Sequence, residues 1–188
     1  MTPQRTSPSP WIERWEHLIA PDGSVLDVAA GSGRHATWLA ARGHVVTAVD
    51  RDGAAVMPLT SIAEVIVADI EAAPWPLAGR RFDAVVVTNY LWRPLLPTLT
   101  ASLAEGGVLL YETFAAGNET VGRPARPDFL LRPGELLEAG AGLRIVAYED
   151  GFLANPDRFV QRLAAVREPA AAVARRYPLT PGAPGPGR

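Results

Sequence analysis

Two aspartates and a pair of glycines are the residues of this chain best suited to bind a ligand. Asp27 stands at the end of a short apolar run, and Gly31 and Gly33 follow it in a turn of small residues. Glycine has no Cβ, so such a turn lets backbone N–H groups at the start of a helix approach a ligand closely. The Asp27 carboxylate suits a positively charged group, such as an amino-acid ammonium. Asp50 ends the next apolar run, where an acid can accept hydrogen bonds from ribose hydroxyls.

Polar side chains also follow the next two apolar runs. Asp69 comes after the run that starts at Val65, and Asn89 comes after the run that starts at Phe82. Open α/β sheets bind ligands at the edge where the carboxyl ends of their strands meet. The four strand ends therefore predict a single ligand site lined by polar groups.

Alternating strands and helices must position these groups. A helix is expected to begin at Ser9-Pro10, and another follows the glycine turn. Two prolines, Pro74 and Pro76, forbid a continuous helix between the third and fourth strands. The last two strands read as an antiparallel hairpin. The expected strands are 25–28, 44–50, 65–71, 82–90, 108–113, 143–148 and 158–167, and the later helices are 94–103 and 135–139.

In these motifs the chain resembles the class I S-adenosylmethionine-dependent methyltransferases. The order of an acid, a glycine-rich turn, a second acid and a third acid is typical of that family, and the ordered motifs cover roughly residues 20–115. One departure is Ala29, which stands where many members have a first glycine. The glycine turn alone also fits a dinucleotide-binding loop, so a nicotinamide-dependent oxidoreductase is an alternative. That class usually needs a tyrosine–lysine or histidine pair, and this chain has no lysine.

The resemblance implies the fold and the domain limits. The fold class is α/β, a Rossmann-like three-layer sandwich with a mostly parallel seven-stranded sheet and an antiparallel last strand. A single domain is expected over residues 9–167. Residues 1–8 are expected to be disordered, and residues 168–188 form a flexible tail rich in proline, glycine and alanine.

The resemblance also assigns roles to residues. Asp27 and the turn would surround the methionine part of the cofactor, Asp50 would hold the ribose, and Asp69 with Ile70 would contact the adenine. Thr88, Asn89 and Tyr90 would lie next to the methyl group and the acceptor. The cofactor-binding set implied for S-adenosyl-L-methionine is Asp27, Ala29, Gly31, Gly33, Asp50, Arg51, Asp69, Ile70 and Asn89.

Methyl transfer from a sulfonium is an in-line displacement, so the protein chiefly supplies position, desolvation and, where needed, a base. Tyr90 ranks first as the catalytic residue among the ionisable groups at this edge. The Asn-Pro-Pro-Tyr arrangement of many enzymes that methylate exocyclic amines is absent, since Asn89-Tyr90-Leu91 has no proline.

A long loop, residues 114–134, starts at the same edge and has little periodicity. Loops of this length are usually functional or disordered, and we interpret it as a lid over the acceptor. Arg123 and Arg126 in it favour an anionic metabolite or nucleotide, because arginine binds carboxylate and phosphate through paired hydrogen bonds. Trp11 and Glu112 are further candidates for acceptor contacts.

Composition limits the remaining classes. The chain has 188 residues, a net charge of −2, no cysteine and 18 basic residues, all arginine. Cysteine-nucleophile and Schiff-base chemistry are therefore excluded, and the three scattered histidines indicate no metal site. No apolar run could span a membrane, which favours a cytoplasmic protein. The short chain without a basic patch favours a small-molecule acceptor, with a nucleic-acid methyltransferase or a non-catalytic S-adenosylmethionine-binding module as alternatives. The acceptor atom and the oligomeric state are not encoded in these motifs.

Overall fold

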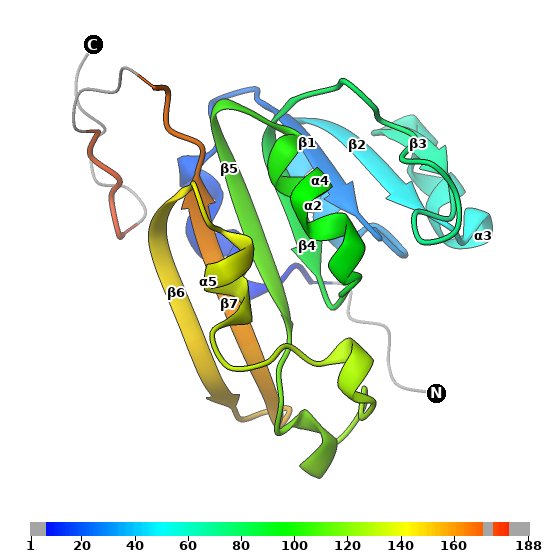
Figure 1. Cartoon of the computed structure of the whole chain (residues 1–188). Helices are drawn as coiled ribbons and strands as arrows, with labels where there is room; N and C mark the ends of the chain where they lie inside the picture. The colour runs from blue at the N-terminus through cyan, green and yellow to red at the C-terminus, as the bar shows by residue number, and fades with distance from the viewer. Residues whose placement is uncertain (1–6, 171–174, 181–188) are drawn as a thin grey trace.

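A computed structural model describes residues 7–170 and 175–180 of the chain. Its described part is built on a seven-stranded sheet with the strand order β3-β2-β1-β4-β5-β7-β6 (Figure 1). Neighbouring strands from β3 to β5 are parallel, whereas β7 lies antiparallel between β5 and β6. The expected Rossmann-like sheet with an antiparallel last strand is thereby confirmed. The strands are Ser24–Val28 (β1), Val45–Asp50 (β2), Glu64–Val67 (β3), Phe82–Thr88 (β4), Leu103–Phe114 (β5), Arg144–Leu153 (β6) and Arg158–Val166 (β7).

Helices cover both faces of the sheet and complete three layers (Figure 1). One face carries α1 (Pro10–Trp15), α2 (Arg34–Ala40) and α3 (Gly53–Val56), and the other carries α4 (Leu96–Ala101) and α5 (Glu135–Ala139). Single 3-10 turns connect them: η1 (Glu16–Leu18), η2 (Met57–Ser61), η3 (Arg93–Leu95), η4 (Asn118–Thr120) and η5 (Pro127–Phe129).

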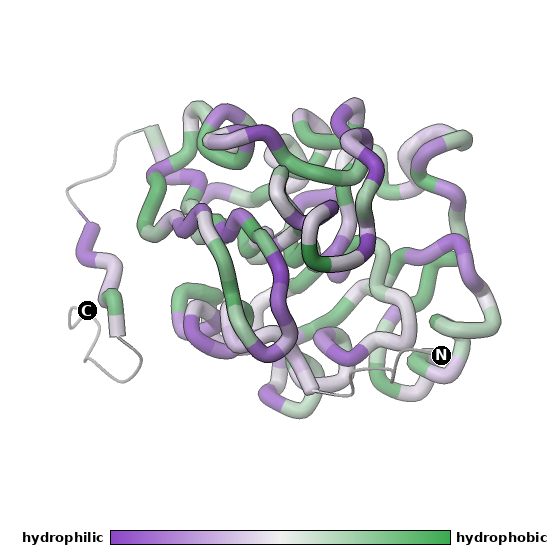
Figure 2. Tube along the Cα trace, turned by 90° about the horizontal axis from the view of Figure 1, so that it is seen from below, coloured by the Kyte–Doolittle hydropathy of each residue, from purple (hydrophilic) through white to green (hydrophobic). Residues whose placement is uncertain are grey.

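Strand β4 shows how the sheet supports both layers. Side chains alternate across a strand, so Ala84 and Val86 enter the core under α1–α3, while Val85 and Val87 enter the core under α4 and α5. All four are fully buried, and burying a valine side chain contributes about 1.5–3 kcal/mol. Figure 2 shows the hydrophilic segments mostly on the outer turns of the chain.

Local signals account for the element boundaries. Helix α1 begins as expected, because the Ser9 Oγ accepts a hydrogen bond from the Trp11 N–H at 3.2 Å and Pro10 occupies the first helical position. The structure describes no helix between β3 and β4, in agreement with the two prolines there. Strand β5 starts earlier than expected, because Leu103 already pairs with Phe82 of β4.

The two ends of the chain are described only in part. Residues 1–6 of the expected disordered start, and residues 171–174 and 181–188 of the expected tail, lie outside the described residues. Tyr177 packs against the core under α1–α3, and its hydroxyl donates to Glu168 at 3.1 Å. The described segment 175–180 therefore contacts the domain.

Candidate functional site

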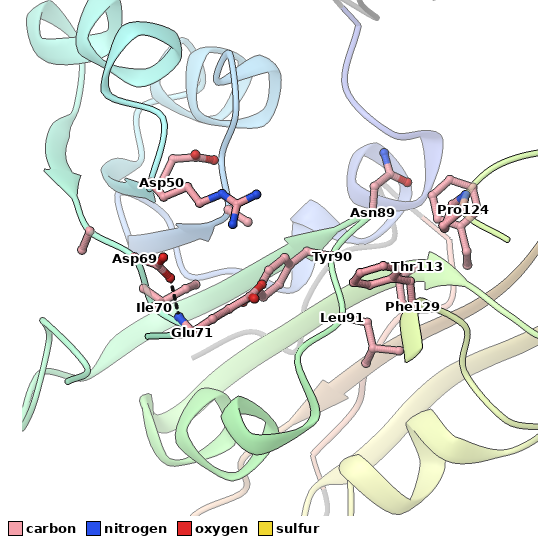
Figure 3. A pocket seen from close by; sticks show the side chains of 14 residues that line it. Asp50, Asp69, Ile70, Glu71, Asn89, Tyr90, Leu91, Thr113, Pro124 and Phe129 are labelled. Carbon is pink, nitrogen blue, oxygen red and sulfur yellow. Dashed lines mark hydrogen bonds between the residues drawn. The ribbon is translucent and has the colours of Figure 1, made fainter. Parts of the chain in front are cut away.

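A pocket of about 360 Å³ lies at the carboxyl ends of the first five strands (Figure 3). This volume falls in the range of small-molecule sites, roughly 300–1,000 Å³. Its walls come from the ends of β1 to β5 and from the 114–134 loop. The lining residues are Ala29, Asp50, Arg51, Ala68, Asp69, Ile70, Glu71, Asn89, Tyr90, Leu91, Thr113, Phe114, Pro124 and Phe129.

The turn after β1 brings its backbone to the pocket through left-handed conformations. Ala29, Gly31 and Gly33 have φ angles of +53°, +56° and +73°. Ala29 lines the pocket, whereas Gly31 and Gly33 do not. The left-handed conformation strains the backbone at Ala29, which a glycine would avoid. Gly33 instead begins α2 and lies against the side chain of Leu59. The two glycines therefore shape the turn from outside the cavity.

Asp50 is held in place by two backbone groups. Its Oδ2 accepts from the Gly31 N–H at 2.7 Å, and its Oδ1 accepts from the Asp52 N–H at 2.8 Å. A carboxylate has about four acceptor positions, so further donors can still bind it from the pocket side. The contact with Gly31 ties the end of β2 to the turn after β1.

Asp27 supports the same turn without lining the pocket. Its carboxylate is buried and accepts a hydrogen bond from the Ala36 N–H in α2 at 3.1 Å. Burial raises the pKa of Asp27 from 3.8 to about 7, and the nearby Asp50 carboxylate raises it further, while the hydrogen bond from Ala36 opposes the shift. The group is therefore poised to change its charge near neutral pH.

The end of β3 forms the opposite wall. Asp69 Oδ1 accepts from the backbone N–H groups of Glu71 and Ala72 at 3.0 and 3.1 Å, which fixes its carboxylate at the start of a tight turn. Ile70 lines the pocket and also belongs to the core under α4 and α5. Glu71 lines the pocket as well and was missed by the sequence analysis, although it follows the two predicted residues directly.

Tyr90 lines the pocket in surroundings that favour its protonated form. Its ring lines the pocket, and its hydroxyl points toward Glu71 (Figure 3). Burial raises the pKa of Tyr90 above its ordinary value of 10, and the neighbouring Glu71 carboxylate raises it further. Such a phenol stays protonated at neutral pH and cannot take up a proton. Tyr90 is therefore a wall of the pocket, and its role as the catalytic residue stays a prediction.

The other end of the pocket is largely apolar. Asn89, with a φ of +55°, stands there with Thr113, Phe114, Pro124 and Phe129. The Asn89 N–H donates to the carbonyl of Glu112 at 2.9 Å, so pairing between β4 and β5 continues to the edge of the site. Of this group, only Asn89 was predicted from the sequence. The position of the long loop after β5 was the available signal for the others.

Trp11 and Glu112 are not part of this pocket, which corrects both expectations. Trp11 is buried in the core under α1–α3 and donates its Nε1–H to the carbonyl of Leu163 at 3.2 Å. Glu112 is fully buried, and its carboxylate accepts from Arg162 Nε at 2.6 Å and from Ser9 Oγ at 3.1 Å. Both side chains serve to fix α1 on the sheet.

The arginines of the 114–134 loop are exposed to solvent. Arg126 pairs with Asp128 at 2.8 Å, and its guanidinium lies 5.3 Å from the ring centre of Phe129. Arg123 is exposed and precedes Pro124, which lines the pocket. The loop thus reaches the pocket through Pro124 and Phe129 rather than through either arginine.

Neither a metal-binding cluster nor a membrane-spanning helix occurs in the described residues. They contain no group of three or more His, Cys, Asp or Glu side chains arranged to hold a metal ion. None of their helices is long and apolar enough to cross a membrane.

Part of the chain matches a known family model. Residues 25–107 match the model of a family described as a methyltransferase domain. No curated protein sequence matches the chain significantly. Among solved structures, TehB of Haemophilus influenzae has a TM-score of 0.67 and 21% identity, covering 81% of this chain and 59% of TehB. This chain therefore spans less than two thirds of TehB.

Two other solved structures have the same fold. A SAM-dependent methyltransferase of Methanosarcina mazei has a TM-score of 0.66 and 15% identity, covering 86% of this chain and 99% of that one. A coclaurine N-methyltransferase bound to N-methylheliamine and SAH has a TM-score of 0.61 and 14% identity, covering 83% of this chain and 70% of that one. Residues 25–107 thus resemble a methyltransferase domain, and the chain has the fold of the solved S-adenosylmethionine-dependent methyltransferases.

Proposed function

We propose that the protein transfers a methyl group from S-adenosyl-L-methionine to a small-molecule acceptor. The observation that carries this proposal is the anchored Asp50 carboxylate, which faces a pocket at the carboxyl edge of the sheet together with Asp69 and Asn89. The solved relatives described as SAM-dependent or bound to SAH support the choice of cofactor. When bound, the cofactor supplies an electrophilic methyl group on a sulfonium.

The residues present fit this cofactor. The free acceptor positions of Asp50 suit the two ribose hydroxyls, and Asp69 with Ile70 suits the polar edge and the flat face of an adenine. The left-handed turn at Ala29 leaves room for the amino-acid part. Three carboxylates and only one guanidinium, that of Arg51, line the pocket, which suits a ligand with a net positive charge.

The apolar end of the pocket suits an acceptor that is small and largely uncharged where it contacts the protein. Phe114, Pro124 and Phe129 exclude water there, and Asn89 and Thr113 can orient a polar atom. The protein then acts by position and desolvation, because an in-line displacement needs the nucleophile opposite the leaving sulfur. Neither Arg123 nor Arg126 lines this pocket, so the proposal does not rest on the anionic acceptor expected from them.

Calorimetric titration with S-adenosylhomocysteine tests the proposal, with NADH as the parallel ligand. Saturable one-to-one binding of S-adenosylhomocysteine alone is the expected result. Absence of that binding would refute the cofactor assignment, and binding of NADH would favour an oxidoreductase instead. An acceptor screen with the loaded protein would then measure methyl transfer directly.

Replacing Asp50 by alanine is expected to weaken S-adenosylhomocysteine binding by about 10–100-fold. The loss of a charged hydrogen-bond acceptor costs about 1–3 kcal/mol, and each 1.4 kcal/mol is tenfold in affinity. The matched control is Asp52→Ala, which removes the exposed side-chain cap of α3 outside the pocket and should leave the affinity within about threefold. Equal affinity of the Asp50→Ala and wild-type proteins would contradict the ribose assignment.

Two substitutions of Tyr90 separate its ring from its hydroxyl. Tyr90→Phe should keep the affinity for S-adenosylhomocysteine within about threefold, because the ring rather than the hydroxyl forms the wall of the pocket. Tyr90→Ala should weaken binding by about tenfold, since it removes that apolar surface. A large loss in Tyr90→Phe, measured by the same titration, would show that the hydroxyl contacts the ligand.

A further inference from the structure

Arg93 lies just after β4 and reaches across to the 114–134 loop. Its Nη1 donates to the carbonyl of Asp128, and its Nη2 donates to the carbonyl of Leu130, both at 2.8 Å. These two carbonyls flank Phe129, which lines the apolar end of the pocket. One guanidinium therefore fixes the backbone on both sides of a residue that forms the pocket wall.

The other side of the guanidinium is held by Glu135, the first residue of α5. Arg93 Nε donates to Glu135 Oε1 at 2.6 Å, and Arg93 Nη2 donates to Glu135 Oε2 at 3.0 Å. Glu135 Oε2 also accepts from the Arg132 N–H at 2.8 Å, and the Glu135 side chain is only 5% exposed. This paired geometry needs the planar fork of arginine, because a lysine ammonium is a single point charge.

The loop also has contacts away from Arg93, since the buried Asn118 donates to the Pro124 carbonyl at 2.9 Å and accepts from the Phe159 N–H at 3.2 Å. Its two ends are tied near β5, where the Leu131 N–H donates to the Phe114 carbonyl at 2.9 Å and the Ala116 N–H donates to the Leu131 carbonyl at 2.8 Å. Phe129 itself is 42% exposed. The Arg126–Asp128 pair is 73% and 70% exposed, and pairs so exposed contribute little. Arg93 therefore holds the backbone on both sides of Phe129 from outside the loop.

We propose that Arg93, together with Glu135, is a latch that holds the 114–134 loop closed and Phe129 against the pocket. Arg93 is thus a positioning residue for the acceptor end of the site. Opening the latch releases the segment around Phe129 while the sheet and the cofactor-binding strand ends stay in place. The latch is inferred from the hydrogen bonds of Arg93 alone. Only its effect on ligand retention depends on the proposed function.

Limited chymotrypsin digestion with mass spectrometry tests the latch without any ligand. The initial rate of cleavage after Phe129 is compared with the rate after Phe152, which is 49% exposed in the β6–β7 hairpin and serves as an internal reference. Arg93→Ala and Glu135→Gln should raise the Phe129 to Phe152 ratio about tenfold, because cleavage follows local opening. Arg93→Lys should lie between wild type and Arg93→Ala.

Arg123→Ala is the matched control, because it removes an exposed arginine of the same loop that does not line the pocket. It should leave the cleavage ratio within about twofold of wild type. An unchanged ratio in Arg93→Ala would overturn the latch. A parallel rise of both rates would also overturn it, since Arg93 would then stabilise the whole domain rather than the loop.

A second readout is the dissociation rate of S-adenosylhomocysteine measured by stopped flow. Arg93→Ala should release the ligand about tenfold faster, because it opens the wall formed by Phe129. Arg123→Ala should not change the rate. If the wild-type protein does not bind S-adenosylhomocysteine, the proposed function fails while the cleavage ratio still decides the latch.

Discussion

Replacing Gly33 by alanine is expected to lower the free energy of unfolding by about 2–5 kcal/mol. The φ of +73° is a left-handed conformation, which costs a residue with a Cβ about 1–2 kcal/mol. A Cβ at Gly33 would also collide with the side chain of Leu59, and overpacking a core costs about 1–3 kcal/mol. Leu59 is only 5% exposed, so it has little room to move. Denaturant unfolding at neutral pH measures the loss.

Gly31→Ala separates strain from collision. Gly31 has a similar φ of +56°, but a Cβ there would meet no atom within 4 Å, so only the strain of about 1–2 kcal/mol is expected. Ala29, at +53°, shows that the turn accommodates an alanine in this conformation. In a Leu59→Ala background the cost of Gly33→Ala should fall to that of Gly31→Ala. If Gly33→Ala and Gly31→Ala lower the unfolding free energy equally in the wild-type background, the collision with Leu59 is contradicted.

The parts of the fold that depend on local signals could be predicted from the sequence. These signals include the apolar runs that end in Asp50 or Asn89, and the prolines Pro74 and Pro76. Each determines the backbone structure of the residues within a few positions of it in the sequence. The early start of β5 could not be predicted, because Gly106 and Gly107 indicate a turn before Val108. The earlier segment becomes a strand through pairing of Leu103 with Phe82, a tertiary contact.

The residues of the candidate site also divide into those that the local sequence predicts and those that depend on tertiary packing. Asp69 lines the pocket because it lies two residues after the end of β3, at the carboxyl edge of the sheet. Glu112 and Thr113 are adjacent in β5, yet only Thr113 lines the pocket, because successive side chains point to opposite faces. The choice between the two faces is made by packing against α1. Arg93 could not be recognised for a related reason, since its partners lie far along the chain and meet it only in the fold.

Replacing Asp27 by asparagine is expected to remove a pH dependence of stability on the order of 4 kcal/mol. Below the ordinary pKa of 3.8, the carboxyl is protonated in both the folded and the unfolded chain, and its contribution to stability is fully present. As the pH rises toward the folded pKa of about 7, the unfolded chain loses the proton first, so stability falls. Asparagine does not titrate and keeps an acceptor for the Ala36 N–H.

The measurement is the difference in unfolding free energy between Asp27→Asn and wild type from pH 4 to pH 8. Taking the difference cancels the contributions of the other titrating groups. The unfolding free energy of Asp27→Asn minus that of wild type should therefore increase with pH and level off above the folded pKa of Asp27. A difference that does not change with pH would show that Asp27 is ionised in the folded protein throughout. That result would contradict burial as the cause of its raised pKa.

The same carboxyl links the stability of the turn to ligand binding. If the ammonium of the bound cofactor lies near this turn, as we propose, its charge favours the ionised form of Asp27 and lowers the pKa of that group. Binding of S-adenosylhomocysteine at pH 6.5 should then release protons and tighten as the pH rises to 8. Titrations in two buffers of different ionisation enthalpy count those protons, and Asp27→Asn should lose this contribution. Equal proton release by the wild-type and Asp27→Asn proteins would show that Asp27 does not respond to the ligand and only supports the turn, through its hydrogen bond with the Ala36 N–H.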